Sequence, residues 1–337
     1  MRSLHTPEAR PTTRLLVALL ALLAILPVSW PPPTPAEASP AVPAISAPAG
    51  GAFGNAVPCL AGPDTFVTTR FANTLYFPSG SRLDAAGARA MPALQTVTAT
   101  GAGPTLANLQ SVGAIYGLAY DDGRASGRER IFAAAVTKRL TGYGPAGAGG
   151  IYVFQRIGTG WSLIGSVVVP GAVAASRSGA SDVSAVASVG KTSLGDIEIS
   201  PDGRSLFVVN IGPRRIERFD LMGGALPAHQ SSIAIGLDRI STDPAVRADL
   251  WPFALEFYPF PARTTTNQQV LVVGVTDSAE RGLSRAPYTD TAGNFTVSPQ
   301  AHVLVYNLTT GGWWKDLTQD LGNSPALANR HQISQFG

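Results

Sequence analysis

Residues 194–221 read LGDIEISPDGRSLFVVNIGPRRIERFDL and contain three strand-like segments separated by turns. The middle segment, 205–210 (SLFVVN), is almost continuously apolar, whereas 215–221 (RIERFDL) is amphipathic. The Pro-Asp-Gly-Arg sequence at 201–204 forms a tight turn, because Pro presets φ and Gly accepts positive φ. The unit therefore predicts an antiparallel sheet, to which 231–235 (SSIAI) adds a fourth strand.

The same order of segments occurs twice more, with Gly, Pro, Asp and Asn clusters between the segments. The two further sets comprise residues 115–120, 130–136, 150–155 and 161–169, and residues 253–258, 270–275, 302–308 and 313–317. In a propeller each sheet packs between two neighbours, so its middle strands are buried on both faces and lose polar alternation. We predict an all-β, β-propeller-like fold with four-stranded antiparallel blades and long loops.

The number of four-strand sets in the sequence allows two interpretations of the propeller ring. Propellers usually close with four to eight blades, and three sets are clear in this sequence. Either further blades are irregular, or the ring is incomplete because the chain is the front part of a longer product. We assign 64–337 to the propeller-like domain and expect one short Ala-rich helix near 84–94.

The N-terminus predicts export. Three arginines within the first 14 residues precede the apolar run 15–26 (LLVALLALLAIL). A run of this length fits a signal peptide and is short for a membrane span, which needs about 20 residues. Ala-Glu-Ala at 36–38 supplies a cleavage pattern. We therefore predict a signal peptide over 1–38, a secreted or cell-surface protein and no transmembrane span after cleavage.

Residues 39–63 are rich in Pro and Ala and are expected to stay extended and flexible. The single cysteine, Cys59, forms neither an intramolecular disulfide nor a cysteine-based metal site. The hydrophobic content of 45% argues against a disordered chain. The net charge is +3, and no basic block interleaves with aromatic residues, so nucleic-acid binding is not supported.

Several segments resemble the propeller-like N-terminal region of large bacterial surface proteins, a type often followed by SdrD-like B repeats. The segments that carry the resemblance are IYGLAY (115–120), FAAA (132–135), GYGPAGAGGIY (142–152), LGDI (194–197), SPDG (200–203) and LWPFAL (250–255). The resemblance implies a surface module whose partner is an extracellular protein or glycan. No adhesive tandem repeat follows within this chain.

Asp196 and Glu198 are the first candidate site. They are two residues apart on a predicted strand and so point to the same side. The first strand of a propeller blade lines the central channel, where paired carboxylates can bind Ca²⁺ or serve acid–base chemistry. The simpler interpretation is that they bond neighbouring blades or face water. A catalytic role predicts that they converge with another acidic or Asn side chain at the channel mouth, within metal-binding distance, and a dispersed arrangement would contradict it.

Lys138 and Arg139 are the second candidate. They precede the Gly-rich loop 142–150, where a cationic pair beside backbone N–H groups can bind an anion. The loop lacks the glycine and lysine spacing of a nucleotide-binding loop. The simpler interpretation is a solvated loop edge.

The remaining motifs predict structure rather than chemistry. Asp121-Asp122-Gly123 matches only a fragment of a calcium loop and is explained by turn formation. His229, His302 and His331 are far apart and do not suggest a zinc site. The Trp313-Trp314 pair is expected to place one ring in the core and the other at a blade edge. We assign no catalytic residue, metal site or cofactor, with calcium as the one alternative.

These observations lead to one functional prediction and two alternatives. The prediction is an exported, non-enzymatic interaction module in which rigid blades display loops that bind a partner. The first alternative is a lactonase-like propeller hydrolase that uses channel carboxylates, with or without calcium. The second alternative is a stalk-bearing adhesin whose binding repeats lie beyond residue 337.

Overall fold

The computed structural model describes residues 66–70, 90–98, 101–176, 182–259, 269–278, 288–289, 295–296 and 300–320. The expected signal peptide, the Pro- and Ala-rich segment and Cys59 lie outside these residues. Within the described ranges, no helix combines the length and the apolar character that a membrane crossing requires.

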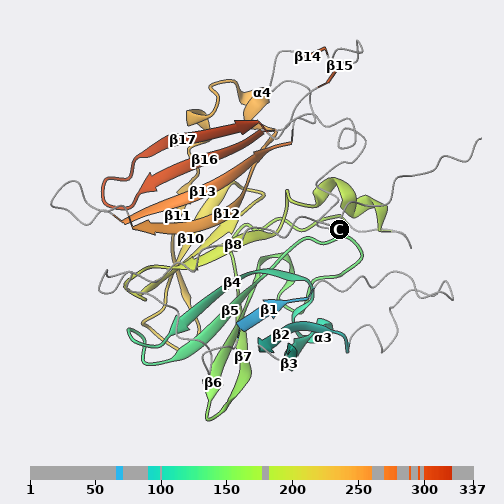
Figure 1. Cartoon of the computed structure of the whole chain (residues 1–337), viewed down its shortest axis with the longest axis vertical. Coiled ribbons are helices and arrows are strands. Elements are labelled where there is room, and N and C mark those ends of the chain that lie inside the picture. The colour runs from blue at the N-terminus through green and yellow to red at the C-terminus, as the bar shows by residue number, and fades with distance from the viewer. Residues whose placement is uncertain are drawn as a thin grey trace, which may run out of the picture. The chain divides into compact units, whose positions relative to one another are not determined.

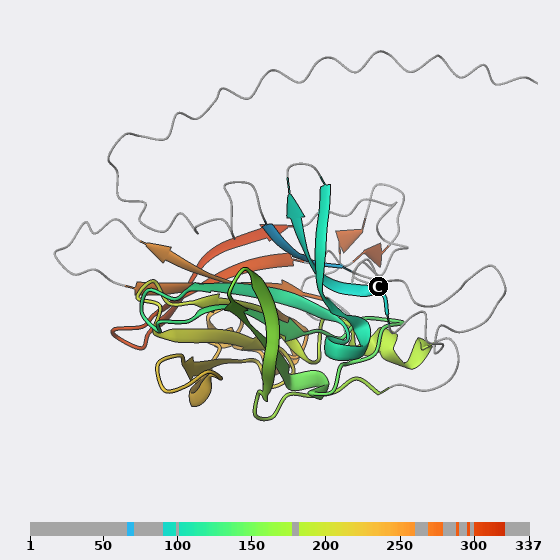
Figure 2. The same ribbon diagram turned by 90° about the horizontal axis from the view of Figure 1, so that it is seen from below.

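Strands dominate the described residues, and the helical segments between them are short (Figure 1). The strands of the described part form one three-stranded, three four-stranded and one two-stranded antiparallel sheet. Each sheet is built largely from strands that follow one another in sequence, so the colours of Figures 1 and 2 change sheet by sheet. The predicted all-β, propeller-like fold with four-stranded antiparallel blades is confirmed.

The strand-like segments within 194–221 and 231–235 form one four-stranded sheet, the central one, as predicted. Its strands, in spatial order, are β11 (Ala228–Ala234), β10 (Arg215–Asp220), β9 (Ser205–Asn210) and β8 (Leu194–Ile199). The turn between β8 and β9 forms as predicted, because Gly203 has a φ of +68° and Asp202 accepts a hydrogen bond from the backbone of Arg204.

The two sets on either side of this sheet also form four-stranded sheets. One contains, in spatial order, β4 (Ile115–Asp122), β5 (Glu129–Ala135), β6 (Gly150–Ile157) and β7 (Gly160–Val168). The other contains β12 (Leu250–Pro259), β13 (Gln269–Asp277), β16 (Gln300–Asn307) and β17 (Trp313–Asp320). The small pair β14 (Tyr288–Thr289) and β15 (Phe295–Thr296) comes between β13 and β16 in the chain. The sequence pattern therefore predicted the order and pairing of all three sheets.

A three-stranded sheet precedes them and was not predicted. It contains β1 (Phe66–Thr69), β2 (Pro92–Thr98) and β3 (Gly101–Asn108), and β1 contacts β4 of the next sheet. Of the helix expected near 84–94, residues 84–89 lie outside the described residues. The expected helix is wrong at its C-terminal end, where the structure has strand β2. The apolar residues Ala93 and Leu94 are completely buried there, so tertiary packing outweighs the helix preference of an Ala-rich segment. A short helix, α3 (Leu109–Val112), follows β3.

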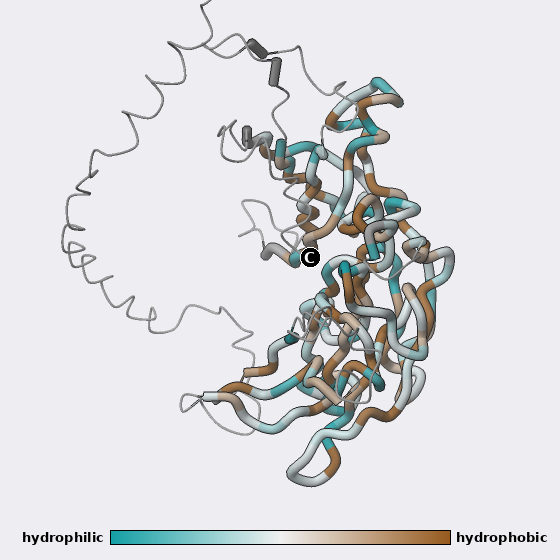
Figure 3. The backbone as a smooth tube through the Cα atoms, turned by 90° about the vertical axis from the view of Figure 1, so that its right-hand side faces the viewer, coloured by the Kyte–Doolittle hydropathy of each residue, from teal (hydrophilic) through white to brown (hydrophobic). Residues whose placement is uncertain are grey.

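Apolar side chains fill the space between successive sheets. Along β9, Leu206 and Val208 join a cluster shared with β5 and β6, whereas Phe207 and Val209 join a cluster shared with β12 and β13. Both faces of the strand are therefore buried, which explains its continuous apolar sequence. Hydrophobic stretches recur along the strands in Figure 3.

The first strands of the three four-stranded sheets approach one another through their backbones. β8 contacts both β4 and β12. A Cβ built on Gly117 of β4 would lie 2.7 Å from the carbonyl oxygen of Gly195, and one on Gly195 would lie 2.5 Å from that of Phe253. Both distances are shorter than real Cβ contacts. The two glycines are thus required by the close approach of neighbouring sheets.

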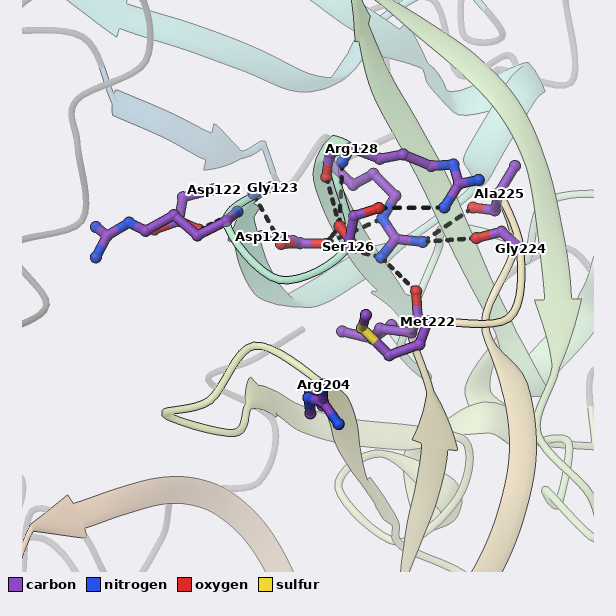
Figure 4. A network of polar contacts seen from close by, with 12 residues as sticks. Asp121, Asp122, Gly123, Ser126, Arg128, Arg204, Met222, Gly224 and Ala225 are labelled. Atoms are coloured by element: carbon purple, nitrogen blue, oxygen red, sulfur yellow. Dashed lines mark hydrogen bonds and ion pairs between the residues drawn. The ribbon is translucent and has the colours of Figure 1, made fainter.

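A buried arginine, Arg130, joins the β4–β7 sheet to the next sheet. Figure 4 labels Asp121 on one side of this contact and Gly224 and Ala225 on the other. Arg130 on β5 is fully buried, and its Nε and Nη2 donate to Oδ2 of Asp121 over 3.1 and 2.7 Å. The same guanidinium donates to the carbonyl oxygens of Leu221, Gly224 and Ala225 between β10 and β11. Because its charge and its donors are satisfied together, this arginine can be buried at an acceptable cost.

The Arg130→Met variant should lose about 3–5 kcal/mol of unfolding free energy, because it leaves the Asp121 carboxylate buried without its cation. Urea denaturation followed by circular dichroism measures the loss. The matched control is Arg124→Met, which removes the surface pair with Asp122 and should cost less than about 1 kcal/mol. Equal losses in the two variants would contradict the structural role of Arg130.

The Gly195→Ala variant should lose roughly 1–3 kcal/mol, because the added methyl group would overlap the Phe253 carbonyl. The control is Gly160→Ala on β7, where a Cβ meets nothing within 4 Å. Thermal unfolding of both variants measures the difference. A Gly195→Ala protein as stable as the control would show that the first strands separate without cost.

Candidate functional site

The first strand of each four-stranded sheet contains a β-bulge at a corresponding place. The register shifts between Ile115 and Leu118 in β4, between Leu194 and Ile197 in β8, and between Pro252 and Ala254 in β12. A bulge inserts one residue, bends the strand and redirects side chains, and bulges are frequent beside active sites. The bulges therefore mark one region in which three sheets present irregular backbone to one another.

Asp196 lies within the bulge of β8 and is half-buried. Its Oδ1 accepts a hydrogen bond from the backbone N–H of Ile197 over 3.0 Å, and its Oδ2 accepts one from Leu255 of β12 over 3.4 Å. Burial raises the pKa of Asp196, as does the negative charge of Glu256, while the two N–H donors lower it. The side chain is thus held between β8 and β12 by donors that favour its ionised form.

Glu198 follows two residues later on the same strand and is also half-buried. Burial, followed by the charges of Glu256 and Asp196, raises the pKa of Glu198 to about 8. The carboxyl group therefore keeps its proton at neutral pH. Two neighbouring carboxyl groups with different proton affinities are suited to act as an acid and a base.

Glu256 on β12 is the third acidic residue and was not predicted. Its side chain is exposed, and its charge raises the pKa values of both Asp196 and Glu198. Glu198 and Glu256 occupy equivalent positions, because each directly follows the first buried residue after a bulge, Ile197 or Leu255. This equivalence depends on the bulges and is not visible in the sequence. The charge of Glu256 thus acts on both residues from the next sheet, while a catalytic role for Asp196 and Glu198 stays a prediction.

An aromatic pair adjoins the carboxylates and was also not predicted as part of a site. The rings of Tyr116 on β4 and Phe253 on β12 lie 4.9 Å apart between centroids, tilted by 57°. Burial and then the charge of Asp196 raise the pKa of Tyr116, so its hydroxyl remains a hydrogen-bond donor. Three sheets thus contribute side chains to one region, which we call the inner-strand site: Tyr116, Asp196, Glu198, Phe253 and Glu256.

Lys138 and Arg139 lie outside this site. They follow β5, and none of the hydrogen bonds or ion pairs between described residues joins them to Asp196 or Glu198. The interpretation of a solvated loop edge is wrong for Lys138, which is 3% exposed. Burial lowers its pKa. The anion site predicted at this pair stays a prediction.

The other candidate motifs have structural roles. Asp121 and Asp122 accept hydrogen bonds from the backbone of Gly123 and Arg124, as turn formation requires. Trp313 packs against the core while Trp314 is exposed, as expected for the tryptophan pair. Among the residues that the structure describes, no three His, Cys, Asp or Glu side chains are grouped so that they could hold a metal ion.

Comparisons with known proteins give only distant structural likenesses. No model of a known protein family and no curated protein matches the chain. A hypothetical selenium-binding protein from Sulfolobus tokodaii matches at 16% identity and a TM-score of 0.40, over 77% of this chain and 53% of its own. A putative 6-phosphogluconolactonase from Bacteroides uniformis matches at 15% identity and a TM-score of 0.32, over 77% and 69%.

The periplasmic gluconolactonase of Pseudomonas aeruginosa matches at 11% identity and a TM-score of 0.34, over 69% of this chain and 66% of its own. The chain spans about half the length of the Sulfolobus protein. Likeness at these values describes the fold alone.

The predicted non-enzymatic interaction module is wrong. The matching structures that stand against it are the two named as lactonases. The resemblance to bacterial surface proteins stays a prediction.

The stability of the protein should fall as pH rises from about 4.5 to about 8, to the extent that Glu198 controls it. In this interval the unfolded chain has released the Glu198 proton while the folded chain retains it, so raising pH favours unfolding. Urea denaturation of wild type and Glu198→Gln across this range measures the effect. The Glu198→Gln variant should lack this pH-dependent loss of unfolding free energy. Its stability relative to wild type should therefore increase as pH rises toward 8. Parallel pH dependences would contradict the shifted pKa.

Proposed function

We propose that the protein is a hydrolase that opens lactones, which are cyclic esters, at the inner-strand site. The observation that supports this proposal is that Glu256 of β12 acts through its charge on both Asp196 and Glu198 of the adjacent first strand β8. A non-catalytic strand surface has no need to hold three acidic side chains together, because their mutual repulsion opposes folding. Two of the matched structures are named as lactonases, and these names guide only the choice of the first substrate to assay.

In this proposal Asp196 is the general base. Burial raises the pKa of Asp196, while the N–H groups of Ile197 and Leu255 donate to its carboxylate and oppose that rise. It accepts a proton from a water molecule while the water oxygen attacks the carbonyl carbon of the lactone. The two backbone donors fix the direction of the carboxylate and so orient that water.

Glu198 is the general acid. Because its pKa is about 8, it is protonated at neutral pH and can transfer its proton to the ring oxygen as the carbon–oxygen bond breaks. The products are one hydroxyl and one carboxyl group. Proton exchange with solvent returns Asp196 to its ionised form and Glu198 to its protonated form. Glu256 acts as a positioning residue, since its charge keeps the proton on Glu198.

The sequence also indicates where this reaction takes place. Residues 1–38 predict a signal peptide, and they lie outside the described part of the structure. We therefore propose that the protein acts outside the cytoplasm, as a secreted or cell-surface hydrolase.

Asp196→Asn and Glu198→Gln should each lower kcat for D-glucono-1,5-lactone by about 10²–10⁴-fold, the range typical of a lost general acid or base. The assay is a pH-indicator measurement of acid release, corrected for spontaneous hydrolysis. Asp238→Asn is the matched control, because Asp238 is an exposed carboxylate paired with Arg239 in the segment between β11 and β12. Full activity in Glu198→Gln would remove Glu198 from the mechanism.

The pH profile separates the acid from a merely structural residue. Wild-type kcat/KM should fall as pH rises through about 8, where Glu198 loses its proton. Glu256→Gln should move this decline to lower pH, because removing a neighbouring negative charge makes Glu198 more acidic. An unmoved decline would show that Glu256 has no influence on the acid.

A further inference from the structure

The turn that follows β5 takes no part in the proposed reaction. Lys138 and Thr141 form an isolated antiparallel bridge, so Arg139 and Leu140 are the two central residues of a tight turn. Leu140 has a φ of +73°, a left-handed conformation that such turns usually give to glycine or asparagine. We call residues 138–141 the Arg139 turn.

Hydrogen bonds hold the Arg139 turn in place. Oγ1 of Thr137, the residue before the turn, forms hydrogen bonds with the hydroxyl groups of Tyr143 over 2.6 Å and of Thr192 over 2.7 Å. Within the turn, the backbone N–H of Leu140 donates to Oδ2 of Asp182 over 2.7 Å. The backbone is therefore fixed in advance, so ligand binding does not have to order it.

Arg139 lacks the acceptors that the fold provides to another arginine. Arg130 is fully buried, and its Nε, Nη1 and Nη2 all donate to oxygen atoms. Arg139 is half-buried, and its Nε is buried without a hydrogen-bond partner in the described part of the structure. A donor withdrawn from water and left without an acceptor is unfavourable, most of all on a charged group. An oxygen acceptor supplied by a ligand would remove this deficit.

The charges at the turn select the class of ligand. Lys138 is 3% exposed and precedes Arg139 in the chain, while Asp182, which binds the turn, is 7% exposed. These two cations and one carboxylate leave at most one positive charge without a counterpart. Burial lowers the pKa of Lys138, which favours its neutral form and reduces the positive charge further. A singly charged carboxylate therefore matches the turn better than a phosphate group, which carries up to about two charges.

We propose that the Arg139 turn binds the carboxylate group of a small organic acid. The Nε–H and an Nη–H of a guanidinium form a fork that fits the two oxygens of a carboxylate through parallel hydrogen bonds. Because the Arg139 side chain is only half-buried, a ligand reaches it from solvent. The proposed carboxylate site goes beyond the hydrolase function and does not depend on it.

The test is a titration of the purified protein, labelled with ¹⁵N at arginine and leucine, with sodium acetate at neutral pH and constant ionic strength. The Nε–H signal of Arg139 is the one missing from Arg139→Gln, and the amide signal of Leu140 is the one missing from Leu140→Met. Acetate should shift both wild-type signals together. Sodium chloride at the same concentration should shift neither, because a chloride ion cannot accept the paired hydrogen bonds of the fork.

The variants locate the site through the Leu140 amide signal. Arg139→Gln should weaken acetate binding at least about tenfold, the loss expected when hydrogen bonds between charged groups are removed. Arg139→Lys keeps the charge but lacks the planar fork, so it should also bind acetate more weakly than wild type. Arg124→Gln is the matched control, because Arg124 is an exposed arginine in the segment before β5. It should bind acetate as wild type does.

Three results would overturn the proposal. Acetate leaves the Arg139 signal of wild type unmoved, a measurement that stands even where a variant is unstable. Arg139→Gln and Arg124→Gln bind acetate equally well, which places the binding elsewhere. Inorganic phosphate binds more tightly than acetate, which contradicts the carboxylate class. None of these results bears on the hydrolase proposal, which lactone hydrolysis tests separately.

Discussion

Contact between the backbones of neighbouring first strands organises this protein. β8 lies against β4 on one side and β12 on the other, at a separation that excludes even a methyl group at Gly117 and Gly195. Such an approach leaves no room for side chains between the strands, so side chains must leave the contact in other directions. The apolar ones enter the clusters between sheets, and Asp196 lies within the bulge of β8.

The bulges connect this packing to chemistry. A regular strand would alternate its side chains strictly, which would turn Asp196 and Glu198 toward the same environment. The bulge at Asp196 instead allows this carboxylate to accept a hydrogen bond from Leu255 of the neighbouring sheet. Glu198 lies beyond the bulge, where burial and negative neighbours favour its protonated form. Two similar carboxyl groups thereby acquire different proton affinities.

The sequence predicted those features that depend on burial along a single strand. The run SLFVVN at 205–210 predicted a strand buried on both faces. In the structure its alternate residues pack into two different hydrophobic clusters. It did not reveal the sheet formed by β1 to β3, because an Ala-rich segment is ambiguous until its packing partners are known. The contribution of Glu256 was equally hidden, since it depends on which strands become neighbours after folding.

Two glutamates of the central sheet show what distinguishes a structural carboxylate from a chemical one. Glu217 on β10 is 1% exposed and interacts with His229, Ser232 and Asn210, so its acceptor capacity serves the fold. Glu198 on β8 accepts a backbone hydrogen bond from Ile199, but burial and then its acidic neighbours raise its pKa. A buried carboxylate whose bonds are satisfied has little left to offer a substrate. One that is half-buried among like charges can change its protonation state, which is the property that acid catalysis needs.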